Sequence, residues 1–279
     1  MMEDFLRDGI IIPPRPEIAI RIEELAVNPK ARSSDVAALI GQDSGLTAAL
    51  YRLVGTVAVG GLGMQARSGV TPLDQVVTTL GMTQVANIVK SAMLRRVVSA
   101  DLPAYEKFWE RSSDIALLCS IIAQKQVAVC NVFFDQAYMF GLFHDCGVPI
   151  LMQRFPGYRD AFLQISQSGC PDYEAEDELL NTDHTVAGHL LARYWHLPDS
   201  ICGAIRRHHD MLDTGHPAYT LVSMLRLAIH CYNAYHGYDD REWFDFRKPA
   251  LGELGIHPEG LREFMDDTLD IFSQRKSRC

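Results

Sequence analysis

Apolar residues recur every three to four positions along most of this chain, and this spacing is typical of amphipathic α-helices. The first helical pattern contains Ile18, Ile22 and Leu25 and ends before Pro29, because proline cannot continue helical hydrogen bonding. Similar patterns follow at Val36, Leu39 and Ile40, at Leu46, Leu50 and Leu53, and at Val85, Ile88, Val89 and Met93. We therefore predict an all-α fold.

A glycine-rich stretch over residues 55–69 interrupts the helical periodicity and predicts an irregular loop. It has neither the lysine nor the flanking strand of a phosphate-binding loop, so the sequence disfavours nucleotide binding there. Pro72 and Thr83 then begin two further helical patterns. The chain turns near residues 100–103, and we expect residues 1–100 to form an N-terminal helical lobe.

The second half of the chain predicts one longer helical bundle over residues 101–236. Its apolar faces carry, in order, Phe108, Arg111, Ile115, Leu118 and Ile122; Ala137, Phe140, His144, Val148 and Leu151; His184, Gly188, Leu191 and Trp195; and Ile201, Ile205 and His208. A last core helix is predicted over residues 219–235, and Gly188 is expected to let a neighbouring backbone come close. For residues 237–279 we expect a surface appendage, from 239 to 260, and a terminal helix.

Several histidines lie on these predicted apolar faces. His144 is followed directly by Asp145, His184 begins a helical pattern, and His208 and His209 are adjacent. Burying several imidazoles with a carboxylate is costly unless each polar atom has a partner. Three explanations stay open at this point: a bound metal, a bound anion, or an internal polar network.

Composition limits the classes of partner. The chain has a formal net charge of -9 and no run of basic residues, which argues against nucleic acid or an anionic membrane as the main partner. No segment reaches the roughly 18 apolar residues of a membrane span, and the acidic start does not resemble a signal peptide. The seven cysteines lack paired zinc-type spacing, and we interpret them as reduced thiols of a cytoplasmic protein.

Motifs in both halves of the chain resemble the HDOD family, a branch of the HD superfamily of helical metal-dependent phosphohydrolases. The N-terminal motifs are Pro13-Pro14-Arg15-Pro16-Glu17-Ile18, Leu39-Ile40-Gly41-Gln42-Asp43, and Pro72-Leu73 through Thr79-Leu80-Gly81. The later motifs are Gly141 through Gly147, His184 through Gly188, Trp195-His196-Leu197-Pro198, and Ile205-Arg206-Arg207-His208-His209. Their order and spacing make the match specific over about residues 10 to 230. The resemblance implies an HD-domain, phosphodiesterase-like helical bundle with a smaller N-terminal lobe.

The resemblance also implies a ligand set for metal, and half of that set is replaced here. Active members of the superfamily use an early histidine, the His-Asp pair and a late aspartate. The pair is present as His144 and Asp145, but Arg111 stands at the early position and Ile229 at the late one. A permanently charged guanidinium repels a metal ion.

Related HD-GYP phosphodiesterases carry extra histidines for a second metal. His184, His208 and His209 match those histidines in type and order. The lysine expected soon after the His-Asp pair is Val148, and the glycine-tyrosine-proline signature survives only as Gly215-His216-Pro217 at a shifted spacing. These departures disfavour cleavage of a cyclic dinucleotide.

Two arginines, Arg111 and Arg226, lie on apolar faces, where an unpaired guanidinium would be very costly. We hypothesise that Arg111 fills the space of the absent metal and pairs with Asp145. Alternatively, Arg111 and Arg226 together with the histidines could bind a phosphate or nucleotide anion. The acidic run at residues 174–178 is interpreted as a solvated helix face, although Glu178 and Asp183 are near enough in sequence to orient His184.

The lead expectation is a non-catalytic module of bacterial signal transduction that binds a protein partner or a small ligand and needs no cofactor. The first alternative is a phosphohydrolase that uses iron, manganese or nickel at His144, Asp145, His184, His208 and His209. The second alternative is a nucleotide or phosphate sensor. Nothing in the sequence indicates the oligomeric state, the partner or the pathway, nor whether a receiver domain acts in trans.

Overall fold

A computed structural model describes residues 11–58, 72–98, 103–165, 173–240 and 242–277. Every regular element among these residues is helical, and no strand occurs in them. The chain divides into two compact units, one of Pro14–Val97 with Gln274–Cys279 and one of Met1–Pro13 with Val98–Ser273. The all-α prediction is confirmed.

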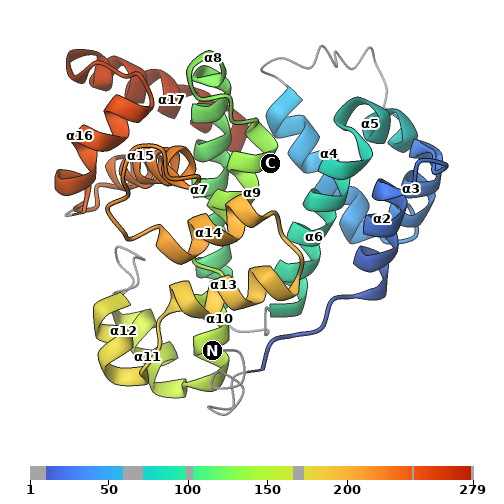
Figure 1. The fold of residues 1–279 in the computed structure, drawn as a ribbon, viewed down its shortest axis with the longest axis horizontal. Coiled ribbons are helices and arrows are strands. Elements are labelled where there is room, and N and C mark those ends of the chain that lie inside the picture. The colour runs from blue at the N-terminus through green and yellow to red at the C-terminus, as the bar shows by residue number, and fades with distance from the viewer. Residues whose placement is uncertain (1–10, 59–71, 99–102, 166–172, 241, 278–279) are drawn as a thin grey trace. The chain divides into compact units, whose positions relative to one another are not determined.

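Within the described residues of Pro14–Val97, the first unit contains five helices, coloured blue to teal in Figure 1: α2 (Glu17–Val27), α3 (Ser33–Ile40), α4 (Ser44–Ala58), α5 (Leu73–Leu80) and most of α6 (Met82–Val98). Helix α3 packs against α2, α4 and α5, and Ile22, Ile40 and Val76 are fully buried. The predicted loop at residues 55–69 is partly wrong, because residues 55–58 continue α4. A single glycine costs a helix only about 1 kcal/mol relative to alanine. Residues 59–69 lie outside the described part.

The second unit contains the remaining helices, coloured green to red in Figure 1. They are α7 (Pro103–Lys125), α8 (Val127–Cys130), α9 (Phe134–Phe143), α10 (Gly147–Arg154), α11 (Pro156–Ile165), α12 (Tyr173–Leu180), α13 (His184–Tyr194), α14 (Asp199–Arg207), α15 (Tyr219–His236), α16 (Trp243–Glu253), the 3-10 turn η1 (Pro258–Gly260) and α17 (Leu261–Lys276). Helix α7 packs against α9 and α15, while α13 packs against α10 and α14.

The single helix predicted through His144 is wrong, because the chain turns between α9 and α10. Gly147, the first residue of α10, lies against the start of α13, where an added Cβ would be 2.0 Å from the carbonyl oxygen of His184. Gly188 of α13 lies opposite, and its predicted role in close packing is confirmed. On one continuous helix, neighbouring side chains point roughly 100° apart. The turn instead buries both His144 and Asp145.

Residues 239–260, which we expected to form a surface appendage, include a helix that packs on the second unit. Helix α16 packs against α15, and its Trp243, Phe246 and Leu251 are buried. The charged residues that suggested an appendage, such as Asp245, Arg247 and Lys248, lie on the exposed side of α16. Charge content therefore hid an amphipathic helix, which belongs to the core of the second unit.

The described cysteines, Cys119, Cys130, Cys146, Cys202 and Cys231, are all free thiols. Burial raises the pKa of the Cys119 and Cys146 thiols, which keeps them protonated and unreactive. Among the described residues, no helix has both the length and the apolar character needed to cross a membrane.

Candidate metal centre

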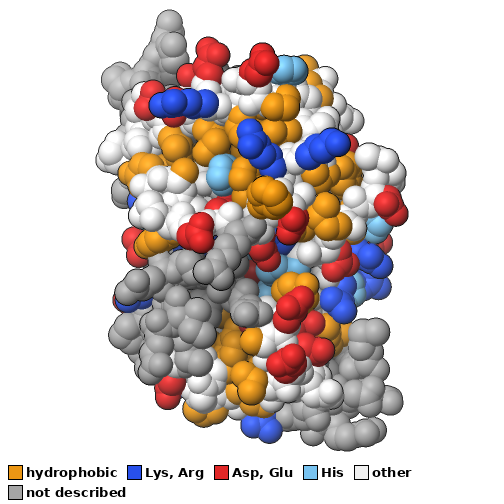
Figure 2. Space-filling model, turned by 90° about the vertical axis from the view of Figure 1, so that its left-hand side faces the viewer, with side chains coloured by type: hydrophobic (Ala, Val, Ile, Leu, Met, Phe, Trp, Pro, Cys, Tyr) orange, Lys and Arg blue, Asp and Glu red, His pale blue; other side chains and the backbone are white. Residues whose placement is uncertain are grey.

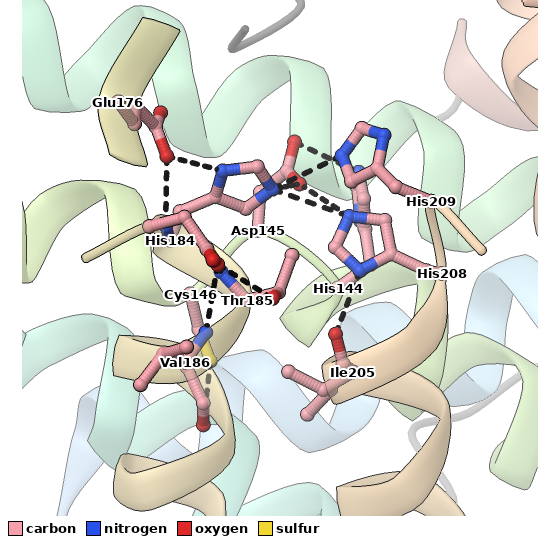
Figure 3. Close-up of polar contacts among 12 residues, drawn as sticks. His144, Asp145, Cys146, Glu176, His184, Thr185, Val186, Ile205, His208 and His209 are labelled. Carbon is pink, nitrogen blue, oxygen red and sulfur yellow. Dashed lines mark hydrogen bonds and ion pairs between the residues drawn. The ribbon is translucent and has the colours of Figure 1, made fainter. Parts of the chain in front are cut away.

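The predicted site residues come together from separate elements of the second unit (Figure 3). The turn after α9 supplies His144 and Asp145, the start of α13 supplies His184, and the end of α14 supplies His208 and His209. The side chains of His144, Asp145, His184 and His208 are at most 3% exposed. The helical period thus predicted which histidines face inward.

Each of the four imidazoles uses its Nδ1 atom to bond an acceptor outside the cluster. These contacts are His144 to Gly141 O at 2.8 Å, His184 to Glu176 Oε2 at 2.7 Å, His208 to Ile205 O at 2.8 Å and His209 to Glu242 Oε1 at 2.9 Å. Carbonyl and carboxylate oxygens only accept, so Nδ1 must carry the proton in every case. In a neutral imidazole, Nε2 is then left with a lone pair.

Three of these Nε2 atoms and a carboxylate oxygen point at one another. His184 Nε2 lies 3.1 Å from His209 Nε2 and 3.3 Å from His208 Nε2. Asp145 Oδ1 lies 3.2 Å from His208 Nε2 and 3.4 Å from His184 Nε2. The four ligand atoms all lie within 4.8 Å of one another. We call these four residues the histidine cage.

The atoms of the histidine cage repel one another unless a proton or a cation lies between them, because every one is an acceptor. Imidazole nitrogen together with one carboxylate oxygen is a common ligand set for divalent transition metals. The carboxylates on the Nδ1 atoms of His184 and His209 form the outer partners typical of such ligands. The donors present therefore fit a divalent metal.

Local electrostatics favour the same interpretation. Burial lowers the pKa values of His208 and His209 well below the ordinary imidazole value. The permanent positive charge of Arg226 lowers the pKa of His209 further. Burial also lowers the pKa of His184, but Glu176 and Asp145 outweigh it, and the net pKa is raised. Two imidazoles thus stay neutral, while negative charge around the third attracts a proton or a metal ion.

The other oxygen of Asp145 faces a different environment. Arg111 Nη1, from α7, donates to Asp145 Oδ2 at 3.1 Å, and both side chains are buried. The structure thus brings the guanidinium of Arg111 and the carboxylate of Asp145 together as an ion pair. His144 Nε2 lies 3.0 Å from the same oxygen without the geometry of a hydrogen bond. Ile229 of α15 is buried and has no ligand atom.

Arg226 of α15 does not contact Asp145. Its guanidinium donates to Glu242 Oε2 and to the main-chain oxygen of His208, and it lies over the Phe246 ring at 4.2 Å. It also approaches His209 Nδ1 at 3.2 Å, but the shorter contact of that nitrogen is with Glu242. Arg226 thus compensates the charge of Glu242.

Two residues of the site, Glu176 and Glu242, were missed in the sequence. Glu176 belongs to the acidic run interpreted as solvated, yet it is 3% exposed. Its spacing from Tyr173 and Leu180 matches one helix face, which is the signal that could have found it. Glu242 is 33 residues from His209, and no local pattern marks it.

The residues proposed to orient His184 have other surroundings. Asp183 accepts from the backbone N–H groups of Thr185 and Val186 and caps α13, while Glu178 is exposed. An aspartate at a helix N-cap satisfies otherwise unpaired backbone donors. Orientation of His184 therefore comes from Glu176, two residues before Glu178.

Two solved structures have a similar fold. A protein of Shewanella amazonensis SB2B, provisionally named a metal-dependent phosphohydrolase, is 20% identical with a TM-score of 0.68, and the match covers 99% of this chain and 95% of that one. A protein of Marinobacter aquaeolei VT8, provisionally named a signal transduction protein, is 23% identical with a TM-score of 0.70, over 98% of this chain and 60% of that one. At these identities the likeness concerns the fold alone.

Sequence comparisons define the family. An uncharacterized protein of Treponema pallidum (strain Nichols) is 24% identical over 221 residues, which cover 78% of this chain and 41% of that protein. The chain thus spans less than half the length of this curated relative. The model of the HDOD domain matches residues 12–211. Because this match covers more than half of the chain, the protein belongs to the HDOD family.

Proposed function

We propose that this protein is a regulatory module of signal transduction that binds one divalent cation in the histidine cage and does not hydrolyse phosphoesters. One observation carries the proposal: Asp145 directs Oδ1 toward three imidazole lone pairs and Oδ2 toward the guanidinium of Arg111. One side of the carboxylate offers ligands to a cation. The other side already has a permanent cation.

The residues of the chain have distinct roles in this proposal. Asp145, His184, His208 and His209 would hold the cation, and Glu176 and Glu242 keep the Nδ1 protons of His184 and His209 in place. A cation bound by such donors supplies Lewis acidity and lowers the pKa of bound water. Arg111 prevents Asp145 from serving a second cation, because two positive charges a few ångströms apart in a buried site repel strongly.

Signal transduction through binding is the function that fits these roles. Ligands for the cation come from three separate segments, so binding would change the relative stability of different packings of α10, α13 and α14. The provisional name of the Marinobacter protein agrees with this reading. We propose that the readout is a signalling partner protein in the bacterial cytoplasm.

A phosphohydrolase remains the second candidate, and the donor set of the histidine cage favours it, as does the provisional name of the Shewanella protein. It would use the same ligands together with His144. An anion sensor has less support, because Arg111 and Arg226 each have a carboxylate partner. A phosphate would have to compete with Asp145 or Glu242 for these guanidinium groups.

Titration of the metal-free chain with Mn²⁺, Ni²⁺ and Fe²⁺ by calorimetry, with elemental analysis of the product, tests the proposal. We expect one bound cation per chain, loss of binding in His208→Ala, and no hydrolysis of bis(4-nitrophenyl) phosphate. His257→Ala is the matched control, because His257 is exposed and outside the cage. Turnover that disappears in His208→Ala would establish the enzyme instead, and a wild type that binds none of the three cations would refute the metal centre.

A further inference from the structure

Helix α12 is attached to the second unit in an unusual way. Of its eight residues, Glu176 alone is buried, and the helix packs against the start of α13. An amphipathic helix is ordinarily held by an apolar face. Here the buried contact is made by a carboxylate, so the docking of α12 depends on polar partners.

Three donors surround the carboxylate of Glu176. Tyr158 Oη donates to Oε1 at 2.5 Å, and the backbone N–H and the Nδ1–H of His184 both donate to Oε2 at 2.7 Å. A buried carboxylate is tolerated only when such bonds compensate for its lost hydration. Two of the three bonds come from one residue of the histidine cage, as Figure 3 shows.

The same helix covers a second member of the cage. The ring of Tyr173, the first residue of α12, lies 4.7 Å from the ring of His209, with an angle of 30° between the two planes. One helix thus touches His184 through Glu176 and His209 through Tyr173. The side chain of His209 is only 5% exposed, so α12 forms part of the cover over the cage.

We propose that Glu176 is the positioning residue of His184 and that, through this residue, the docking of α12 is coupled to cation binding in the histidine cage. This inference rests on the proposed function. A cation on Nε2 withdraws electron density from the imidazole and makes Nδ1–H a stronger donor to Glu176. Coupling of this kind is reciprocal: whatever favours docking of α12 also tightens cation binding.

Docking of α12 also determines part of the surface that the second unit presents. The outward residues of the helix include the acidic Glu174, Asp177 and Glu178, and Leu179 is 80% exposed. Figure 2 views the molecule from the side on which Figure 1 draws α12, and acidic side chains gather in the lower half of this face. Cation binding at the buried His184 would thereby be linked to an exposed acidic helix.

Hydrogen exchange of the α12 amides with and without Mn²⁺ tests the coupling. In the wild type we expect Mn²⁺ to slow exchange across α12 severalfold relative to α17. In Glu176→Gln, exchange should be faster and insensitive to Mn²⁺, and the Kd for Mn²⁺ should rise about 10- to 100-fold. Glu178→Gln is the matched control on the same helix and should behave as the wild type.

A second variant keeps the test independent of the folding of Glu176→Gln. Tyr158→Phe removes the donor to Oε1 and leaves His184 unchanged, so it should give a smaller change in the same direction. Binding of Mn²⁺ without any change in α12 exchange would refute the coupling and leave the proposed function intact. A wild type that binds none of Mn²⁺, Ni²⁺ and Fe²⁺ would refute both. Equal effects of Glu178→Gln and Glu176→Gln would also contradict the positioning role.

Discussion

The two sides of the Asp145 carboxylate differ in how their negative charge is compensated. On the Oδ2 side, the cation is covalently part of the chain, as the guanidinium of Arg111. On the Oδ1 side, neutral imidazoles contribute only lone pairs. The guanidinium is always present, whereas a cation held by lone pairs would bind reversibly. We therefore distinguish a structural half of this buried carboxylate from a candidate binding half.

This difference concerns how the buried charge of Asp145 is balanced. Replacing a ligand by an apolar residue alone would leave Asp145 Oδ2 buried without a cation, which is strongly unfavourable. With Arg111 beside it, the negative charge of Asp145 is balanced on the Oδ2 side. The Oδ1 side keeps all of its donors.

Removal of Asp145 should have the largest effect, because both sides lose their shared anion. In Asp145→Ala, Arg111 is left buried without its carboxylate, and we expect the free energy of unfolding to fall by about 3–5 kcal/mol. Cation binding should disappear as well. Urea unfolding and Mn²⁺ titration measure the two effects, and the exposed Asp213→Ala serves as the control. An Asp145→Ala variant as stable as the wild type would contradict the structural role of the ion pair between Arg111 and Asp145.

Removal of Arg111 should act first on the Oδ2 side of Asp145. We expect Arg111→Met to destabilise the metal-free protein by about 3 kcal/mol, because Asp145 then lacks its fixed cation. Mn²⁺ should raise the Tm of this variant more than that of the wild type, since added positive charge now compensates both oxygens. Thermal unfolding with and without Mn²⁺ measures the difference. Equal shifts of the Tm in the two proteins would mean that the charge of Arg111 does not influence cation binding on the Oδ1 side of Asp145.

A change that makes the two sides alike should alter cation binding in the histidine cage least. In the double variant Arg111→His with Ile229→Asp, the Oδ2 side regains the residue types that the family resemblance implies for metal. We expect the stoichiometry to rise from one to two cations per chain, with the second held more weakly. Calorimetry and elemental analysis count the cations. A stoichiometry that stays at one would show that residues other than Arg111 and Ile229 also prevent a cation from binding on the Oδ2 side.

Helical periodicity was the most useful signal for the fold and for the burial of the site. It predicted that His144, His184 and His208 face inward, and each is buried. It failed at the junction of α9 and α10, because the residues of the turn there are buried at the same spacing as the residues of a helix. At α12 the run of acidic residues led to a wrong interpretation of the one buried glutamate, although its spacing follows one helix face.

The sequence by itself determined the all-α class and the inward direction of the histidines, because these follow from local period and residue type. Its family resemblance implied that Arg111 stands at a ligand position. Only the tertiary structure decided that Glu176 and Glu242 hold the Nδ1 atoms of His184 and His209. Those contacts depend on how separate helices meet, and a local pattern does not specify the geometry of that meeting. The same packing turned four dispersed side chains into one cage of facing lone pairs.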